Sequence, residues 1–187
     1  MKIKAIIFLI LSGLITGCVG VMVAGAAGSM VVYDRRSITM IEKDARIFYV
    51  INRALANDRR FRDSHVSINS FNQVVLLTGE VTSGVLKAQA AKVARETPNV
   101  RRVYDELTIE EPISIKQQSK DAWITGQVRA QMLAESGLES GSIRVVTEND
   151  NVYLMGIATH EQADLAVNVA RQVTGVRKVI KIFLYIV

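Results

Sequence analysis

The chain has 187 residues, and its 23 lysines and arginines against 18 aspartates and glutamates give a formal net charge of +5. The charges are evenly distributed: residues 44–111 contain ten basic and nine acidic side chains, and residues 116–187 contain eight and seven. Neither part therefore has the strong positive charge of a nucleic-acid-binding domain. The single cysteine excludes an intramolecular disulfide bond.

The first residues follow the order of a bacterial secretion signal. Lys2 and Lys4 precede an apolar run, which leads through smaller residues to Cys18. Residues 15–18, with the sequence ITGC, look like a lipobox, where signal peptidase II cleaves before a cysteine that carries lipid. We predict a signal peptide over residues 1–17 and a lipidated N-terminus and tether over residues 18–43. Acyl chains such as palmitate at Cys18 would anchor the protein firmly, because each buried methylene contributes about 0.8 kcal/mol.

A transmembrane helix is the alternative for this segment. Residues 5–33 carry no charge and are long enough to span a bilayer, but five glycines in the stretch weaken it as a helix. Val19, and not an aspartate, follows Cys18. Under the sorting rule for bacterial lipoproteins, Val19 implies transfer to the outer membrane, with a lipid anchor and the protein on the periplasmic face.

Residues 44–111 are predicted to form a first module. Apolar side chains at helical spacing indicate an amphipathic helix at its start, and two alternating runs separated by Asn72 and Gln73 indicate a hairpin. An alanine-rich helix ends before Pro98 and leads to a last strand. The predicted elements are a helix over 44–57, strands over 65–71 and 74–77, a helix over 83–96 and a strand over 101–109.

This order, αββαβ, predicts an α+β fold. A helix between the second and third strands makes that pair parallel through a right-handed crossover, in a mixed three-stranded sheet with two helices on one face. Arg59, Arg60 and Arg62 form the only dense basic cluster. We interpret this cluster as a solvated loop, with an anion site as the alternative.

The second module repeats the first. Residues 74–79, VVLLTG, return 77 positions later as residues 151–156, NVYLMG. A linker over 112–118 and a second module over 119–187 are therefore predicted, with the same fold. Its expected elements are a helix over 119–135, strands over 143–147 and 152–157, a helix over 161–172 and a strand over 176–186. At about 70 residues each module is near the lower limit for an independent core, so we expect the two to lean on each other or on a third surface.

Gly79 and Gly156 occupy equivalent positions in the two modules. We interpret them as points where the second strand turns toward the second helix and glycine's backbone freedom is needed. A phosphate-binding loop is the less favoured alternative, because the rest of such a loop is missing.

These patterns resemble a known family. Two αββαβ units, each with a V-x-L-x-G strand (75–79 and 152–156) and a V-x-x-V strand entry (100–103 and 176–179), look like BON domains. With the lipobox and tether, the whole chain is similar to the dual-BON outer-membrane lipoproteins, most specifically over residues 121–133 and 146–156. The resemblance implies a non-enzymatic protein that binds anionic phospholipid through its second BON domain and supports envelope integrity.

Comparing equivalent positions of the two modules also distinguishes core residues from residues that are free to serve a function. Ile124, Val128 and Met132 match apolar residues of the first module, so they are predicted to be core, whereas Trp123 matches Arg46. An arginine would hardly occupy a core position, so we predict that the only tryptophan points outward. The alternative is that Trp123 packs against the first module as an interdomain anchor.

A lipid-binding face is predicted around Trp123. At about 100° per residue, four residues share one outer face of the second module's first helix: Trp123, Gly126, Ala130 and Leu133. Arg129 and Lys120 lie within a turn or two of Trp123. On an anionic membrane these cations would meet phosphates while the indole of Trp123 lies at the headgroup boundary. In the family that the chain resembles, this helix contacts the membrane.

We therefore predict a phospholipid site made by Trp123, Gly126, Arg129, Ala130 and Leu133. The expected ligands are phosphatidylglycerol or cardiolipin of the inner leaflet of the outer membrane. The alternative function is a protein-interaction scaffold that uses the same face to dock envelope assembly or cell-division partners.

No catalytic set is recognised in the sequence. His65 and His160 match Ser142 and Ser83 across the repeat, and two isolated histidines do not predict a metal site. Cys18 is reserved for lipid. Three carboxylates, Glu148, Asp150 and Glu161, are expected in loops or at helix starts as capping or solvated groups. The sequence thus predicts no enzyme, no cofactor and no metal.

Overall fold

The computed structural model describes residues 36–186, within one compact unit that extends from Val32 to Val187. The predicted signal peptide, Cys18 and most of the tether lie outside the described residues. The first module contains α2 (Ile38–Ala56), the 3₁₀ turn η1 (Arg59–Phe61), β1 (His65–Phe71), β2 (Val74–Val81), α3 (Gly84–Glu96), β3 (Arg102–Asp105) and β4 (Thr108–Ile109). The second contains α4 (Ile115–Ala134), η2 (Ser140–Ser142), β5 (Ile143–Glu148), β6 (Asn151–Ala158), α5 (His160–Gln172) and β7 (Lys178–Tyr185).

The predicted α+β fold and αββαβ order are confirmed in both modules. In each sheet the first two strands are antiparallel and the crossover strand is parallel to the second. One detail differs from the prediction. The last strand of the first module is interrupted at Glu106 and Leu107, so the first sheet has four strands, with β3 and β4 both pairing with β2.

Both first helices begin earlier than predicted. Ser37 caps α2 by accepting a hydrogen bond from the Met40 amide, and Ser114 caps α4 by accepting one from the Gln117 amide. Serine is among the favoured N-cap residues because its hydroxyl satisfies an amide left free at the helix start. The first turn of α4 therefore lies in the segment that the sequence pattern assigns to a linker.

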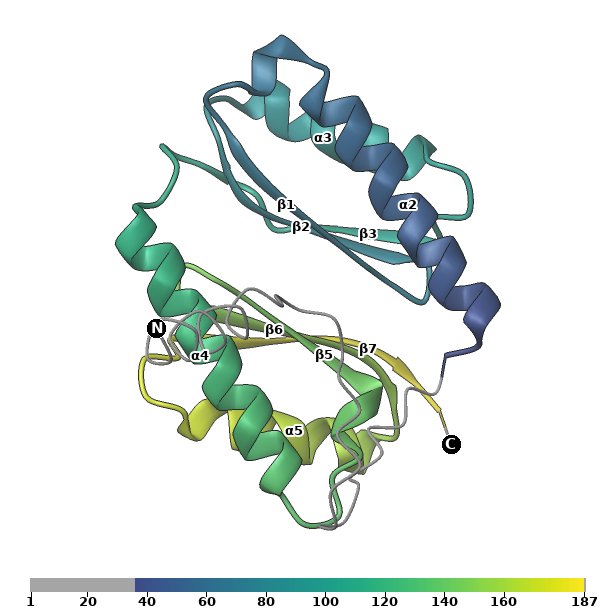
Figure 1. The fold of residues 1–187 in the computed structure, drawn as a ribbon, viewed down its shortest axis with the longest axis vertical. Helices are drawn as coiled ribbons and strands as arrows, with labels where there is room; N and C mark the ends of the chain where they lie inside the picture. Colours follow the sequence, from purple (N-terminus) through teal and green to yellow (C-terminus); the bar gives the residue numbers. More distant parts are fainter. Residues whose placement is uncertain (1–35, 187) are drawn as a thin grey trace, which may run out of the picture. The chain divides into compact units, whose positions relative to one another are not determined.

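The two sheets pack against each other. In Figure 1 they lie between two helix pairs, with α2 and α3 covering the first sheet and α4 and α5 covering the second. Each module has its own core between helices and sheet, and a third core joins the facing sheets. The buried residues of this third core are Phe71, Leu76, Tyr153, Met155 and Ile182.

The third core explains why the second strands read as nearly continuous apolar runs. In β2, Val75 and Leu77 face the helices, while Leu76 faces the second module. Strands buried on both faces need apolar residues at successive positions. The expectation that the small modules lean on each other is confirmed.

One buried aspartate in each module ties the first helix to the hairpin. Asp44 of α2 accepts hydrogen bonds from the amides of Asn72 and Gln73 at 2.7 and 2.8 Å. These two turn residues have φ of 51° and 65°, values that suit a type I′ hairpin turn. The carboxylate thus fixes the end of the hairpin against the helix.

Asp121 of α4 repeats this contact in the second module. It accepts from the amides of Asn149 and Asp150 at 2.8 and 2.9 Å, and these residues also have positive φ. Every member of the first set lies 77 positions before its counterpart. The aspartate, the turn and the helix are therefore one repeated device.

The two repeated glycines lie inside strands and not at turns, so that part of the prediction is wrong. Gly79 pairs with Val66 and has φ of +105°, and a Cβ there would lie 2.1 Å from the His65 carbonyl oxygen. Gly156 pairs with Ile143, and a Cβ there would lie 2.6 Å from the Ser142 carbonyl oxygen. The need for glycine comes from a backbone carbonyl at or just before the start of the first strand, with positive φ added only at Gly79.

Candidate functional site

Helix α4 separates a buried stripe from an exposed apolar face. Ile124, Val128 and Met132 are buried in the core of the second module. Trp123 is 52% exposed and Leu133 is 44% exposed. Trp123 is not part of the core between the sheets, so the structure does not bury it as an interdomain anchor.

The remaining residues of the predicted site are exposed, as Trp123 and Leu133 are. Gly126, Arg129 and Ala130 are exposed, and a Cβ on Gly126 would meet no atom within 4 Å. The first turn of α4 adds Ile115, which is 81% exposed. This residue was missed because the helix was expected to begin after it. We call the surface formed by Ile115, Ser119, Trp123, Gly126, Ala130 and Leu133 the outer face of α4.

Charges are absent from the outer face of α4, whereas α2 carries them at the equivalent positions. Glu42 matches Ser119, Arg46 matches Trp123, and Arg53 matches Ala130, each 77 positions apart. All of these side chains are exposed, so the differences do not affect packing of the core. They change only what the helix presents to its surroundings.

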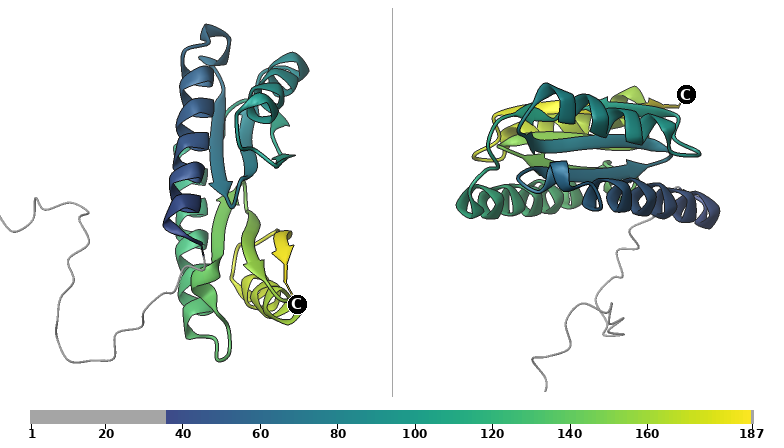
Figure 2. Two further views of the ribbon diagram at one scale, coloured as in Figure 1. Left: turned by 90° about the vertical axis from the view of Figure 1, so that its right-hand side faces the viewer. Right: turned by 90° about the horizontal axis from the view of Figure 1, so that it is seen from above.

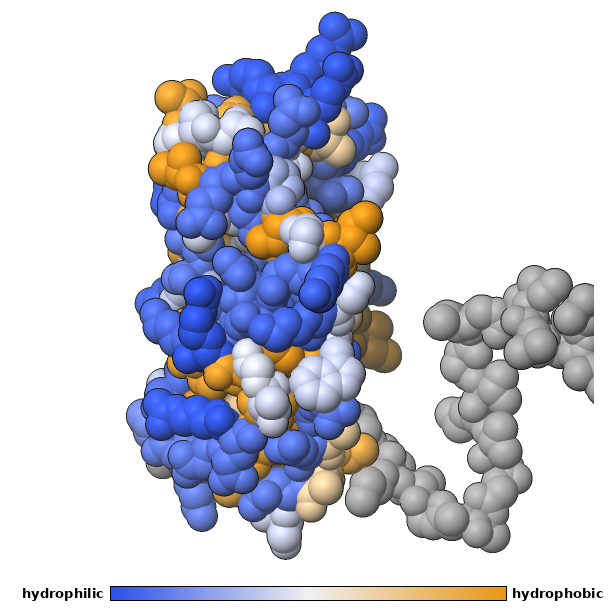
Figure 3. All heavy atoms as spheres, turned by 90° about the vertical axis from the view of Figure 1, so that its left-hand side faces the viewer, coloured by the Kyte–Doolittle hydropathy of each residue, from blue (hydrophilic) through white to orange (hydrophobic). Residues whose placement is uncertain are grey.

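The outer side of α2 also carries exposed apolar side chains, which the comparison of the two modules did not predict. Tyr49 is 59% exposed, and Phe48 and Ile38 are also exposed. In the left view of Figure 2, α2 and α4 lie one above the other along one edge of the two-sheet stack, and α3 and α5 lie along the opposite edge. Figure 3 shows one side of the described region, on which hydrophobic side chains form separate patches among hydrophilic ones.

A groove borders the outer face of α4. It has a volume of about 320 Å³ and is lined by Arg36, Phe71, Arg129, Met132, Leu133, Ser140, Gly141, Ile143, Arg144 and Val145. Its lining contains three arginines and no acidic residue. Arg129 and Leu133 belong both to this groove and to the predicted site.

The arginines of the groove are held in place by neighbouring groups. The Arg129 guanidinium donates to the Val145 carbonyl at 3.1 Å, and that of Arg144 donates to the Ser70 carbonyl at 3.0 Å. The Arg36 guanidinium lies 4.2 Å from the centre of the Phe71 ring and pairs with Asp44 at 2.9 Å. The carbonyl contact orients Arg129 without neutralising its charge, because a guanidinium has five N–H donors. Asp44, by contrast, offsets the charge of Arg36.

The other predicted cations are engaged differently. Lys120 pairs with Asp150 at 2.8 Å, so its charge is partly neutralised at the hairpin turn. Burial by itself would raise the pKa of Asp150, but hydrogen bonds from Lys120 and Gln117 outweigh that effect and lower it. In the basic cluster of the first module, Arg60 pairs with Asp58 at 2.6 Å. Lys120 is therefore less suited than Arg129 to meet a phosphate.

Two residues lie in surroundings that the sequence did not predict. Glu148 was expected in a loop, but it is the last residue of β5 and is buried. His65 was treated as isolated, but its ring lies beside Glu80 and Glu148. Asp150 lies in the hairpin turn and Glu161 in the first turn of α5, where they were expected.

Within residues 36–186, no helix is long and apolar enough to cross a membrane. The predicted transmembrane alternative concerns residues 5–33, which lie outside the described part of the chain.

Comparison with known proteins identifies the modules. The sequence model of the BON domain family matches residues 43–111 and again residues 120–184. The chain belongs to the BON-domain family. The matching model is not that of a catalytic domain, and each match contains one complete αββαβ unit.

Curated relatives match most of the length of the chain. The outer membrane lipoprotein DolP of Haemophilus influenzae is 34% identical over 172 residues, which cover 91% of this chain and 89% of DolP. A 21 kDa hemolysin of Actinobacillus pleuropneumoniae is 34% identical over 71% of this chain and 69% of its own length. The osmotically-inducible protein Y of Escherichia coli is 27% identical over 82% of this chain and 78% of its own length.

Proposed function

We propose that this protein is a lipid-anchored component of the outer membrane whose second BON domain binds anionic phospholipid on the periplasmic face. The observation that carries the proposal is the outer face of α4, which is exposed, apolar and free of charge beside a groove with three arginines. The similarity to DolP over most of both chains supports the location. The proposed role is to maintain envelope integrity, and no catalysis is part of it.

The geometry fits a membrane surface. Tryptophan favours the boundary between headgroups and acyl chains, because its ring is apolar and its N–H is polar. Trp123 and Leu133 would enter this boundary from one side of the helix. Arg129 would then lie at the depth of the phosphates, where a cation gains about 1 kcal/mol near an anionic surface.

The groove provides a place for a headgroup. Its arginines come from both domains, since Arg36 precedes α2 while Arg129 and Arg144 belong to α4 and β5. Guanidinium groups bind phosphate oxygens through paired hydrogen bonds. We infer that a phosphatidylglycerol or cardiolipin phosphate binds here, with its acyl chains directed along the outer face of α4.

A vesicle assay tests this proposal. Residues 32–187, which form one compact unit, are mixed with vesicles of phosphatidylcholine alone or with phosphatidylglycerol added, and bound protein is measured by sedimentation. We expect binding only to the anionic vesicles, weakened by salt. Trp123→Ala and Arg129→Gln should each weaken it several-fold while circular dichroism stays unchanged.

The scaffold function makes the opposite prediction. If the outer face of α4 docks an envelope protein and not lipid, the folded wild-type unit leaves anionic vesicles unbound. Equal binding by wild type and by folded Trp123→Ala would also contradict the lipid proposal.

A further inference from the structure

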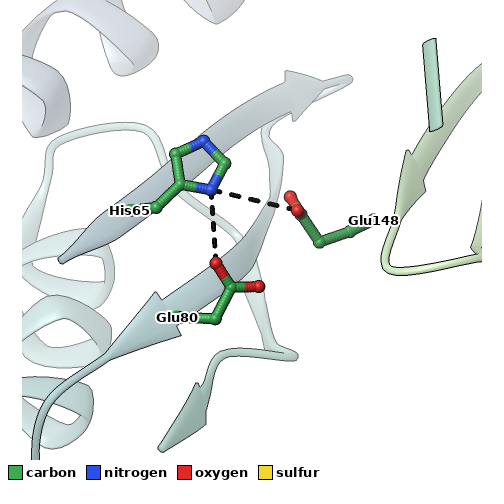
Figure 4. A group of neighbouring side chains, drawn as sticks. All are labelled: His65, Glu80 and Glu148. Atoms are coloured by element: carbon green, nitrogen blue, oxygen red, sulfur yellow. Dashed lines mark ion pairs between the residues drawn. The ribbon is translucent and has the colours of Figure 1, made fainter. Parts of the chain in front are cut away.

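Three side chains from both domains meet at the rim of the sheet-to-sheet interface. His65 begins β1, Glu80 lies opposite it in β2, and Glu148 ends β5 of the second domain. His65 Nδ1 lies 3.5 Å from Glu80 Oε2 and 3.9 Å from Glu148 Oε1. Figure 4 shows His65 and Glu80 on neighbouring strands and Glu148 reaching toward them from the other sheet.

The burial of these groups is unusual for their charge. Glu80 is 1% exposed and Glu148 is 9% exposed. Two carboxylates next to each other and away from water repel each other and lose hydration. Burial raises the pKa of Glu148, and the nearby Glu80 raises it further against the opposing effect of His65. Among these three side chains, only the imidazole of His65 can set a positive charge against the two carboxylates.

The histidine nitrogen faces the two carboxylates at ion-pair distances. His65 Nδ1 is buried and makes no hydrogen bond within the described residues. The imidazole nitrogen and one oxygen from each carboxylate all lie within 4.8 Å of one another. Nitrogen and oxygen ligands of a tetrahedral zinc ion lie about 2.0–2.1 Å from the metal, so they are about 3.3 Å apart. The distances from His65 Nδ1 to the two carboxylates, 3.5 and 3.9 Å, are close to that spacing. The carboxylate oxygens lie within 4.8 Å of each other and would have to move closer together to bind one ion.

Other groups hold the carboxylates in position. The Thr78 hydroxyl donates to Glu148 Oε2 at 3.2 Å, leaving Oε1 directed toward His65. The Ile113 amide donates to Glu80 Oε2 at 3.1 Å. Metal-binding carboxylates are commonly oriented by outer hydrogen bonds of this kind.

We propose that His65, Glu80 and Glu148 form a zinc site that joins the two BON domains. The imidazole nitrogen favours zinc over calcium or magnesium, which prefer all-oxygen sites. Three protein ligands leave a fourth position for water. The His65 side chain is 37% exposed, so the ion and its water can reach the site from the rim.

The site also reaches the segment that leads into α4. Glu80 holds the Ile113 amide, and Ser114 caps α4 immediately afterwards. A bound ion would therefore fix the facing sheets and the start of the proposed membrane-binding helix together. This inference does not rest on lipid binding, since it concerns only how the domains are joined.

Calorimetry of residues 32–187 with zinc chloride tests the proposal. This unit contains no cysteine and two histidines, so few other strong zinc ligands compete. We expect one ion per chain and a higher Tm in the presence of zinc. Glu148→Gln and His65→Asn should each weaken binding at least about tenfold, while the control His160→Asn should leave it unchanged.

A second measurement needs no substitution. In the NMR spectrum of the wild-type unit, zinc should shift the imidazole signals of His65 and leave those of His160 in place. No binding at 100-fold excess of zinc by the folded unit would overturn the proposal. Equal affinity in folded Glu148→Gln, or shifts confined to His160, would overturn it as well.

Discussion

Helices α2 and α4 occupy equivalent places in the two BON domains and begin at equivalent serines, Ser37 and Ser114. Each buries three apolar residues and one aspartate on its inner side. Their outer sides differ, because three charged positions on α2 are uncharged on α4. The inner side thus preserves the fold, and the outer side is where one copy is free to acquire a separate function.

The largest expected effect is a loss of stability, and it is expected at the buried aspartate that α2 and α4 share. Asp44→Ala removes the acceptor of both turn amides and the ion pair between Asp44 and Arg36. Breaking a buried pair costs about 3–5 kcal/mol, so the free energy of unfolding in urea should fall by that amount. Within residues 36–186, Asp121 forms no ion pair with an arginine, so Asp121→Ala should cost less, about 1–3 kcal/mol.

A matched control is available on the surface. Glu96→Ala removes an exposed carboxylate that faces Lys92 across one helical turn, and it should change stability little. Equal stability of Asp44→Ala and Glu96→Ala would show that the aspartate does not hold the hairpin.

The difference between the helices is tested by two exposed aromatic residues. Trp123→Gln should lower the partition of residues 32–187 onto phosphatidylglycerol vesicles about tenfold, because the lost contact of a half-buried ring is worth about 1.5 kcal/mol. Tyr49→Gln, on α2, should change it less than twofold. A loss of similar size in both variants would mean that the two helices contact the membrane together.

The order of the elements was predictable from the sequence, whereas the burial of the two aspartates was not. The αββαβ order and the parallel crossover follow from the spacing of apolar residues along the chain. The agreement between the two copies supports the same order. The helix starts were available too, since Ser37 and Ser114 are repeated N-cap residues. Asp44 and Asp121 were equally visible as a repeat, but aspartate usually reads as a surface residue, so their burial was missed.

The groove and the His65 cluster could not be predicted in the same way. Both depend on two sheets docking face to face, which brings together residues from different domains, such as Phe71 and Arg144 or His65 and Glu148. No local pattern encodes that register. The outward direction of Trp123 was predictable only because the other copy has an arginine at that position.

A smaller effect is expected from converting Leu133 to its counterpart in the first domain. Leu133→Ala reproduces Ala56 and removes part of the exposed apolar area near the groove. Binding to anionic vesicles should fall about threefold to fivefold, since the side chain is already partly covered. Vesicle sedimentation measures this change, and Ile38→Ala on α2 provides the control, with binding expected to stay the same.

The smallest effect is expected from Ser119→Glu, which gives α4 the acidic residue that α2 has as Glu42. The new charge lies about one helical turn from Trp123 and would be repelled by anionic lipid. We expect about a twofold to threefold loss of binding at low salt that shrinks as the ionic strength rises. A loss that does not depend on salt would contradict an electrostatic cause.

The most direct test of the central claim uses the only tryptophan in the chain. Emission from Trp123 in residues 32–187 is recorded while phosphatidylglycerol vesicles are added, with phosphatidylcholine vesicles as the control. If the outer face of α4 enters the headgroup boundary, the emission maximum moves to shorter wavelength and an aqueous quencher loses access with the anionic vesicles alone. Protein that binds these vesicles with unchanged Trp123 emission and quenching would contradict the account.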